Sequence, residues 1–374
     1  MTQKFTKTKM VIFLTIPFLT FLLIMEWGVR AFREFEPNRV LCYDPVMGRS
    51  YCPDTKGYLK ENKVKMHIEV NADGLLGKAY PVKRDLGKYR IAILGDSHTS
   101  GEAVDPKSKF TGVWEKNLSN KIPAGVEVIN FGVGGTGTWQ QLQMFHIKAR
   151  KYKPDLTVVA FCWCNDIENN IDKFKNGNMS PLLDEYGVNW YTRLNVKRKN
   201  FNKWLWNHSA LYQFTRTRYN HLEHYFKRMF LPGYMKGIIY NEKKQARPLY
   251  PYDTVSIFDD LFFFDSEGWD VTRKLIVKLK QKVQENGGEF AVIHFGGMNQ
   301  YRNFPALPLK QFDTFLESQE ISHFNNFDLF LKIDDELLYK NFIPNDGHFN
   351  EIGHRHFAEF STDFLLNLIN KNKV

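Results

Sequence analysis

A serine flanked by an aspartate and a histidine follows an apolar segment in "RIAILGDSHTSGEAV", residues 90–104. A serine hydroxyl is an effective nucleophile when a base takes its proton and a third group orients that base. His348 can supply the base. Asp346 lies two residues before it, and residues two apart point the same way in an extended loop. Ser97, His348 and Asp346 are therefore the candidate nucleophile, base and orienting acid.

The segments around these residues alternate between strands and helices. The predicted strands are 90–94, 126–131, 156–161 and 289–295, and the predicted helices are 108–120, 139–151, 268–288 and about 351–368. Regular βαβα alternation predicts a parallel sheet with helices on both faces. Open α/β sheets carry their sites at the carboxyl ends of the strands, which is where Ser97 lies.

Three further blocks follow "GDSHTSG" in chain order. They are "NFGVGGTGTWQQL" (130–142), "FCWCND" (161–166) and "NDGHFNEIGH" (345–354). Together the four blocks resemble the SGNH/GDSL hydrolase superfamily, in particular its membrane-anchored bacterial members, with some resemblance to alginate O-acetylation proteins. The resemblance runs from about residue 70 to the C-terminus. It implies a three-layer α/β/α fold and an acyl-serine mechanism.

The resemblance also implies an oxyanion hole made by the backbone N–H groups of Ser97 and Gly135 and the side-chain amide of Asn165. Such donors stabilise the negative charge that ester attack creates. The sequence departs from the family pattern twice. Asn345 stands where many members have the orienting aspartate, and the usual glycine before Asn165 is missing.

Each of these residues also has a purely structural interpretation. Ser97 could cap the following helix, as serine often does. Four other histidines, His98, His294, His354 and His356, are more typical of structural positions. The sequence lacks a G-x-S-x-G elbow, the lysine of a phosphate loop and metal-ligand spacing, so we expect no cofactor and no metal.

The net charge of +10 is concentrated in one segment. Residues 190–250 contain thirteen Lys and Arg against two acids, interleaved with aromatic side chains. Such a segment can contact sugar rings or anionic lipid headgroups, or it can be a lid with core aromatics and solvated charges. Nucleic acid is not an expected partner, because the N-terminus predicts an extracytoplasmic location.

The N-terminus carries three lysines, Lys4, Lys7 and Lys9, before an uncharged run at 10–25. No small-residue cleavage site follows, so the run predicts an uncleaved signal anchor that crosses the membrane through residues 10–27. The alternatives are a cleaved signal and a buried helix. The lysines favour a cytoplasmic N-terminus, which places the catalytic part in the periplasm or outside the cell.

Four cysteines fit that location. Cys42 and Cys52 could close a small disulfide or stay unpaired. Cys162 and Cys164 form a C-x-C pair, which we expect to make a poor disulfide.

The expected organisation is an anchor at 1–29, a small extracytoplasmic subdomain at 30–88 and an SGNH domain at 89–374, with a helical, aromatic insertion at about 167–265. The expected function is hydrolysis of an O-acyl ester, such as an O-acetyl group on a carbohydrate. Two alternatives remain open. One is an O-acyltransferase with a multi-span membrane partner, and the other is a non-catalytic carbohydrate-binding module.

Overall fold

The computed structural model describes residues 7–32, 40–170, 201–219 and 267–371, except positions 43, 45, 62–63, 85–86, 168, 203, 217, 299, 304–305, 331 and 345. The described residues fall into two compact units. Residues 7–32 and 201–219 belong to the first, and 40–170 and 267–371 to the second. Most of the insertion expected at 167–265 lies outside the described residues.

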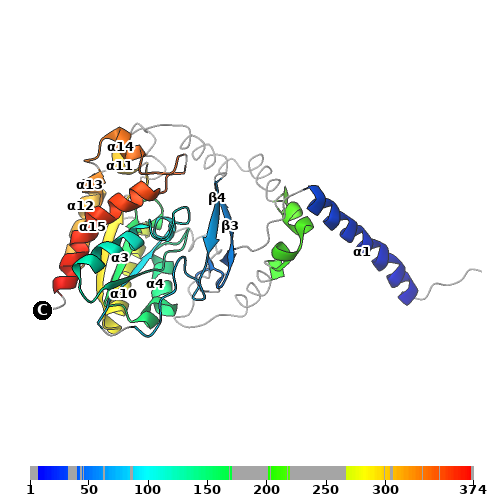
Figure 1. Cartoon of the computed structure of the whole chain (residues 1–374), viewed down its shortest axis with the longest axis horizontal. Helices are drawn as coiled ribbons and strands as arrows, with labels where there is room; N and C mark the ends of the chain where they lie inside the picture. The colour runs from blue at the N-terminus through cyan, green and yellow to red at the C-terminus, as the bar shows by residue number, and fades with distance from the viewer. Residues whose placement is uncertain are drawn as a thin grey trace, which may run out of the picture. The chain divides into compact units, whose positions relative to one another are not determined.

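The second unit is built on a parallel sheet (Figure 1). Its five strands, in the order β6-β5-β7-β8-β9, are β6 (Val126–Asn130), β5 (Tyr89–Gly95), β7 (Leu156–Cys162), β8 (Glu289–Phe295) and β9 (Ser322–Asn325). Every residue of β5 and β7 is buried, which explains why both strands read as nearly continuous apolar runs.

Helices cover both faces of this sheet. The longer ones are α3 (Phe110–Lys121), α4 (Thr138–Ile147), α10 (Glu267–Glu285), α12 (Ala306–Ser318) and α15 (Glu351–Lys371). Helix α3 packs on α15, and the Trp114 indole donates to the Ala358 carbonyl at 3.2 Å. Trp269 of α10 packs on Phe312 of α12, with ring centroids 5.3 Å apart. The three-layer α/β/α arrangement is therefore confirmed.

The shorter helical segments complete the second unit. They are α2 (Ser97–Ser100), η1 (Ala149–Tyr152), α11 (Gln300–Asn303), α13 (Phe327–Phe330) and α14 (Asp335–Tyr339). The helix expected at 139–151 is thus two segments, α4 and η1, because Lys148 between them leaves helical geometry. The sequence prediction also missed β9 and α12.

Residues 40–69 form two antiparallel hairpins in the same unit as the sheet. Strands β1 (Leu41–Cys42) and β2 (Ser50–Tyr51) pair, as do β3 (Lys56–Glu61) and β4 (Val64–Glu69). A disulfide joins Cys42 to Cys52 across the first hairpin.

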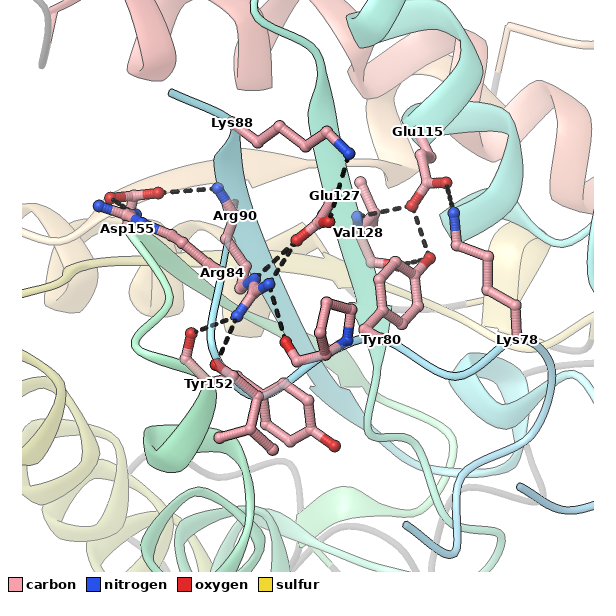
Figure 2. A network of polar contacts seen from close by, with 12 residues as sticks. Lys78, Tyr80, Arg84, Lys88, Arg90, Glu115, Glu127, Val128, Tyr152 and Asp155 are labelled. Carbon is pink, nitrogen blue, oxygen red and sulfur yellow. Dashed lines mark hydrogen bonds and ion pairs between the residues drawn. The ribbon is translucent and has the colours of Figure 1, made fainter. Parts of the chain in front are cut away.

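A buried ion pair ties β5 to β6 at the amino end of the sheet (Figure 2). The fully buried guanidinium of Arg90 donates to one Glu127 carboxylate oxygen from Nε at 2.8 Å and from Nη2 at 2.6 Å. Its remaining donors reach the carbonyls of Tyr152, Val82 and Pro81 at 2.8, 3.2 and 3.1 Å. A buried charge is tolerated when its donors are satisfied in this way. The pair therefore fixes the start of β5, the strand that precedes Ser97.

The first unit contains α1 (Lys7–Phe32). Within the described residues, α1 is the one helix long and apolar enough to cross a membrane: Phe13–Phe32 has a mean hydropathy of 1.5 and is not buried. Residues 204–208 and 210–216 of the same unit are also helical.

Candidate active site

Ser97 is the first residue of α2, immediately after β5 and a tight turn. The buried carboxylate of Asp96 caps this short helix by accepting from the His98 backbone N–H at 2.9 Å. Gly95 permits the turn, because a Cβ atom there would lie 2.1 Å from Oγ1 of Thr99. Asp96 therefore caps the helix, while the Ser97 side chain remains half-buried.

The structure brings the three predicted triad residues together. Nε2 of His348 lies 2.7 Å from Oγ of Ser97, although 251 positions separate the two residues. Nδ1 of His348 makes a short hydrogen bond to Oδ1 of Asp346, which also accepts the His348 backbone N–H at 3.2 Å. With the Nδ1 proton directed at Asp346, Nε2 is the acceptor for the serine proton.

The His348 ring lies against the ring of a second, buried histidine. The centroids of His98 and His348 are 4.7 Å apart, and His98 also contacts Phe295 and Phe349 edge-on. Burial lowers the pKa of His98 well below its usual value, with the nearby His348 acting in the same direction. A neutral His98 adds no charge beside His348, which suits a base that must gain a proton.

Asn165 follows β7 and lies beside Asp96. Its side chain hydrogen-bonds the carboxyl of Asp96, the residue before the nucleophile. Burial raises the pKa of Asp96, while His348 and the hydrogen bonds from His98 and Asn165 oppose that shift. Asn165 is thus bound to the residue that precedes Ser97, and its role as an oxyanion donor stays a prediction.

The glycine-rich loop after β6 forms another side of the site. A Cβ atom on Gly134 would lie 3.7 Å from Cβ of Ser97, so this loop passes directly beside the nucleophile. Gly135 has φ +70°, a conformation that favours glycine. Asn130 fixes the loop by accepting from the Gly132 N–H at 2.8 Å and donating to the Thr99 carbonyl at 2.6 Å.

The first hairpin contributes residues that the sequence analysis did not assign to the site. Tyr51 donates a short hydrogen bond to Glu102, whose carboxylate lies 3.0 Å from the Cβ position of Gly134. Nη1 of the exposed Arg49 lies 3.1 Å from the Cβ position of Gly135. The hairpin residues and their partners in these contacts are more than fifty positions apart, so no local pattern predicts them. The Cys42–Cys52 pair that closes the hairpin was the one signal in the local sequence.

The expectation that Cys162 and Cys164 make a poor disulfide was wrong. The two residues are bonded, and their Cα atoms are 5.2 Å apart, within the usual range. The turn after β7 brings their side chains together, whereas an extended strand would not. The disulfide immediately precedes Asn165.

One group of described residues has metal-ligand side chains close together. The ligand atoms of His98, Cys162 and Cys164 lie within 4.8 Å of one another. Because the two sulfur atoms are bonded to each other, they do not offer the thiolates that a metal site would need. This group does not fit a metal centre.

The other histidines have structural partners. His294 bonds to Asp313 through Nε2 at 2.7 Å and to the Trp163 indole through Nδ1 at 3.1 Å. Nδ1 of the buried His354 accepts from the Phe110 N–H at 3.3 Å. Burial lowers the pKa of His354 to about 3. His356 contacts the Asn341 side chain at 2.7 Å.

No protein-family model and no curated protein match the sequence. Among solved structures, the chain is similar to the acetyl xylan esterase AlAXEase, with 12% identity, a TM-score of 0.39 and coverage of 75% of this chain and 99% of the esterase. It is also similar to a protein of the G-D-S-L family from Desulfitobacterium hafniense (11% identity, TM-score 0.37, coverage 74% and 98%). The lipase/acylhydrolase from Enterococcus faecalis gives 12% identity and a TM-score of 0.39, with coverage of 76% and 96%. At these values the similarity supports no inference about substrate or mechanism.

Proposed function

We propose that this chain is a serine esterase of the SGNH type that hydrolyses an O-acyl ester through an acyl-Ser97 intermediate. The observation that carries the proposal is the continuous chain of hydrogen bonds from Ser97 through His348 to Asp346. A serine hydroxyl bonded to an imidazole that is itself oriented by a carboxylate is the arrangement that activates an alcohol for acyl transfer.

In the first half-reaction, Oγ of Ser97 attacks the acyl carbon while Nε2 of His348 takes the hydroxyl proton. Asp346 stabilises the resulting imidazolium. The carbonyl oxygen becomes an oxyanion, for which we propose the backbone N–H groups of Ser97 and Gly135 and the Asn165 amide as donors. The C–O bond to the leaving alcohol then breaks, and His348 returns the proton to that alcohol.

In the second half-reaction, water takes the place of the alcohol. His348 removes a proton from the water as its oxygen attacks the acyl carbon of the ester on Ser97. The second tetrahedral intermediate collapses, the Ser97–acyl bond breaks, and the serine oxygen regains a proton from His348. The products are a carboxylic acid and the free enzyme.

The proposed substrate is an O-acetyl ester on a carbohydrate, which follows from the resemblance of the four sequence blocks. The proposed location is outside the cytoplasm, with α1 retained as a single membrane anchor ahead of segment 30–88 and domain 89–374. Disulfides persist in oxidising compartments, so the Cys42–Cys52 and Cys162–Cys164 bonds support this location.

The test is ester turnover and active-site labelling of the full-length protein in detergent. We expect p-nitrophenyl acetate hydrolysis and fluorophosphonate labelling in the wild type, and the loss of both in Ser97→Ala. Ser100→Ala is the matched control on the same helix, and it should retain labelling. Labelling that persists in Ser97→Ala would reject Ser97 as the nucleophile.

Assays with and without a sugar acceptor distinguish ester hydrolysis from acyl transfer. We expect acetate release to continue without any sugar acceptor, because water completes the reaction. Labelling without turnover, followed by turnover only when an acetyl acceptor is added, would replace the esterase with an acyltransferase. A folded protein that shows neither activity would favour a binding module.

A further inference from the structure

The end of α1 carries a carboxylate that caps a helix far along the chain. Oε1 of Glu26 accepts from the backbone N–H of Ala210 at 2.8 Å, and Oε2 accepts from the N–H of Leu211 at 2.9 Å and the hydroxyl of Ser209 at 2.7 Å. The helical segment 210–216 begins at this point. Its first N–H groups have no partners within the helix, and its positive dipole end favours a carboxylate.

Arg30, one turn further along α1, binds the end of helical segment 204–208, which precedes the segment capped by Glu26. Nη2 of Arg30 donates to the carbonyl of His208 at 2.9 Å, at the end of segment 204–208. Nε of the same arginine donates to Oε1 of Glu26 at 2.7 Å. The helical break at Ser209 is therefore held from both sides, with a carboxylate at the amino end of one segment and a cation at the carboxyl end of the other.

These contacts lie at the level where α1 would leave a bilayer. The uncharged run starts at Met10, and a hydrocarbon core of about 30 Å needs about 20 helical residues. The span would then end near Val29, between Glu26 and Arg30. Trp27, on the same turn, is 75% exposed, as an aromatic residue at the membrane–water interface would be.

The segment held at this level presents aromatic rings along one helical face. Phe201, Trp204 and His208 follow i, i+3, i+7 spacing, and their rings stack with centroids 6.1 and 4.9 Å apart. Phe201 and Trp204 are 57% and 54% exposed. Two exposed arginines follow, with Arg216 over the Tyr219 ring at 5.3 Å. Exposed rings next to cations are the composition of an interfacial helix.

We propose that residues 201–219 are an interfacial membrane element, docked on the exit of α1 by Glu26 and Arg30, with Phe201 and Trp204 in contact with phospholipid. The inference goes beyond the proposed esterase activity, and it rests on α1 spanning the bilayer. It also gives α1 a second role, because removal of α1 would remove the cap of segment 210–216.

The experiment is photocrosslinking of the full-length protein in vesicles of phosphatidylcholine with about a quarter phosphatidylglycerol. p-Benzoylphenylalanine replaces Trp204 in one sample, Trp27 in a second and Tyr58 in a third. Tyr58 is the matched control, because it is an equally exposed aromatic residue (50%) on β3 of the other unit. We expect crosslinks to lipid from positions 27 and 204, and few from position 58.

A lipid yield at position 204 no higher than at position 58 would overturn the proposal. Absence of crosslinks at position 27 would overturn its premise, that α1 lies in the bilayer. Ester turnover is measured on the same samples, so a failure of the esterase proposal is seen separately.

A second variant tests the docking contacts. Glu26→Ala removes the cap, and we expect the lipid yield at position 204 to fall several-fold while that at position 27 is unchanged. Glu26→Gln keeps an oxygen acceptor and should lower the yield less. Equal yields at position 204 with and without the Glu26 carboxylate would show that these contacts do not hold the segment on the membrane.

Discussion

Nε2 of His348 lies 2.7 Å from Oγ of Ser97, which leaves Nδ1 of the same ring to Asp346. The carboxylate therefore selects the tautomer in which Nε2 can accept the serine proton. We predict that Asp346→Asn lowers kcat about 10⁴-fold, because an amide at this position can stabilise the wrong tautomer. The measurement is p-nitrophenyl acetate turnover at saturating ester.

A second histidine–aspartate pair provides the control. Nε2 of His294 bonds to Oδ1 of Asp313 at 2.7 Å, and Nδ1 of His294 is occupied by the Trp163 indole. Asp313→Asn should leave kcat within about threefold of the wild type, because both nitrogens of the His294 ring are already bonded, to Asp313 and to Trp163. A comparable loss in both variants would mean that Asp346 acts through general stability.

Asn165 is predicted to act on the oxyanion. Removing one such donor costs about 10²–10³ in kcat in a well-studied protease, and we expect a loss of this size for Asn165→Ala with little change in KM. Asn169→Ala is the control, since its amide reaches the Thr136 carbonyl at 3.5 Å. An effect confined to KM would show that Asn165 binds the ground state instead.

The sequence was most informative where a local pattern reports a local structure. The strand at 289–295 was predicted with the bounds of β8, because seven residues of mostly apolar sequence are bounded by glycine and a turn. Ser97, Asp346 and His348 were proposed as a triad because each lies in a characteristic block, and the structure joins their side chains by hydrogen bonds. Strand order brings the ends of β5 and β7 together, which places Asn165 near Ser97, whereas Asp346 and His348 come from the loop before α15.

The parts that the sequence did not reveal depend on distant contacts. Strand β9 is the four-residue segment "SHFN", with half-buried side chains and no alternation of apolar and polar residues. Arg49 reaches Gly135 across eighty-six positions, which no periodicity encodes. The Cys162–Cys164 bond depends on the turn that follows β7, and the pattern C-x-C does not specify that turn.

The Arg90–Glu127 pair makes a prediction about stability (Figure 2). Glu127→Gln leaves the buried guanidinium without its counter-charge, and breaking a buried pair in this way costs about 3–5 kcal/mol. We expect a corresponding fall in the free energy of unfolding measured with urea. Asp363→Asn removes the partner of an exposed pair, Lys121–Asp363, and should leave the midpoint unchanged. An equal fall in the free energy of unfolding in Glu127→Gln and Asp363→Asn would contradict the prediction that burial makes the Arg90–Glu127 pair costly to break.

The Cys42–Cys52 disulfide closes a loop of about ten residues, which in the chain-entropy relation stabilises a fold by about 3 kcal/mol. We predict a loss of that order for the double variant Cys42→Ser with Cys52→Ser, measured by urea unfolding without reductant. The same hairpin positions Tyr51 on Glu102 and Arg49 beside Gly135, so KM should rise as well. A destabilised double variant with an unchanged KM would show that the hairpin does not contribute to substrate binding.

Buried histidines should make the fold sensitive to acid. Burial lowers the pKa of His354 to about 3, from 6.5 in an unfolded chain, so between these pH values the unfolded state binds more protons. The contribution of neutral His354 to the free energy of unfolding is therefore fully present above about pH 6.5 and is lost as the pH falls. Between pH 7 and pH 5, His354 alone lowers the free energy of unfolding by about 2 kcal/mol. The pKa values of His98 and His294 are lowered as well.

We predict that His354→Asn, which keeps an acceptor for the Phe110 N–H, removes about 2 kcal/mol of the difference in unfolding free energy between pH 7 and pH 5, as measured by urea unfolding at both pH values. His67→Asn, at an exposed position on β4, is the control. An unchanged pH dependence in His354→Asn would show that His354 does not remain neutral in the folded protein.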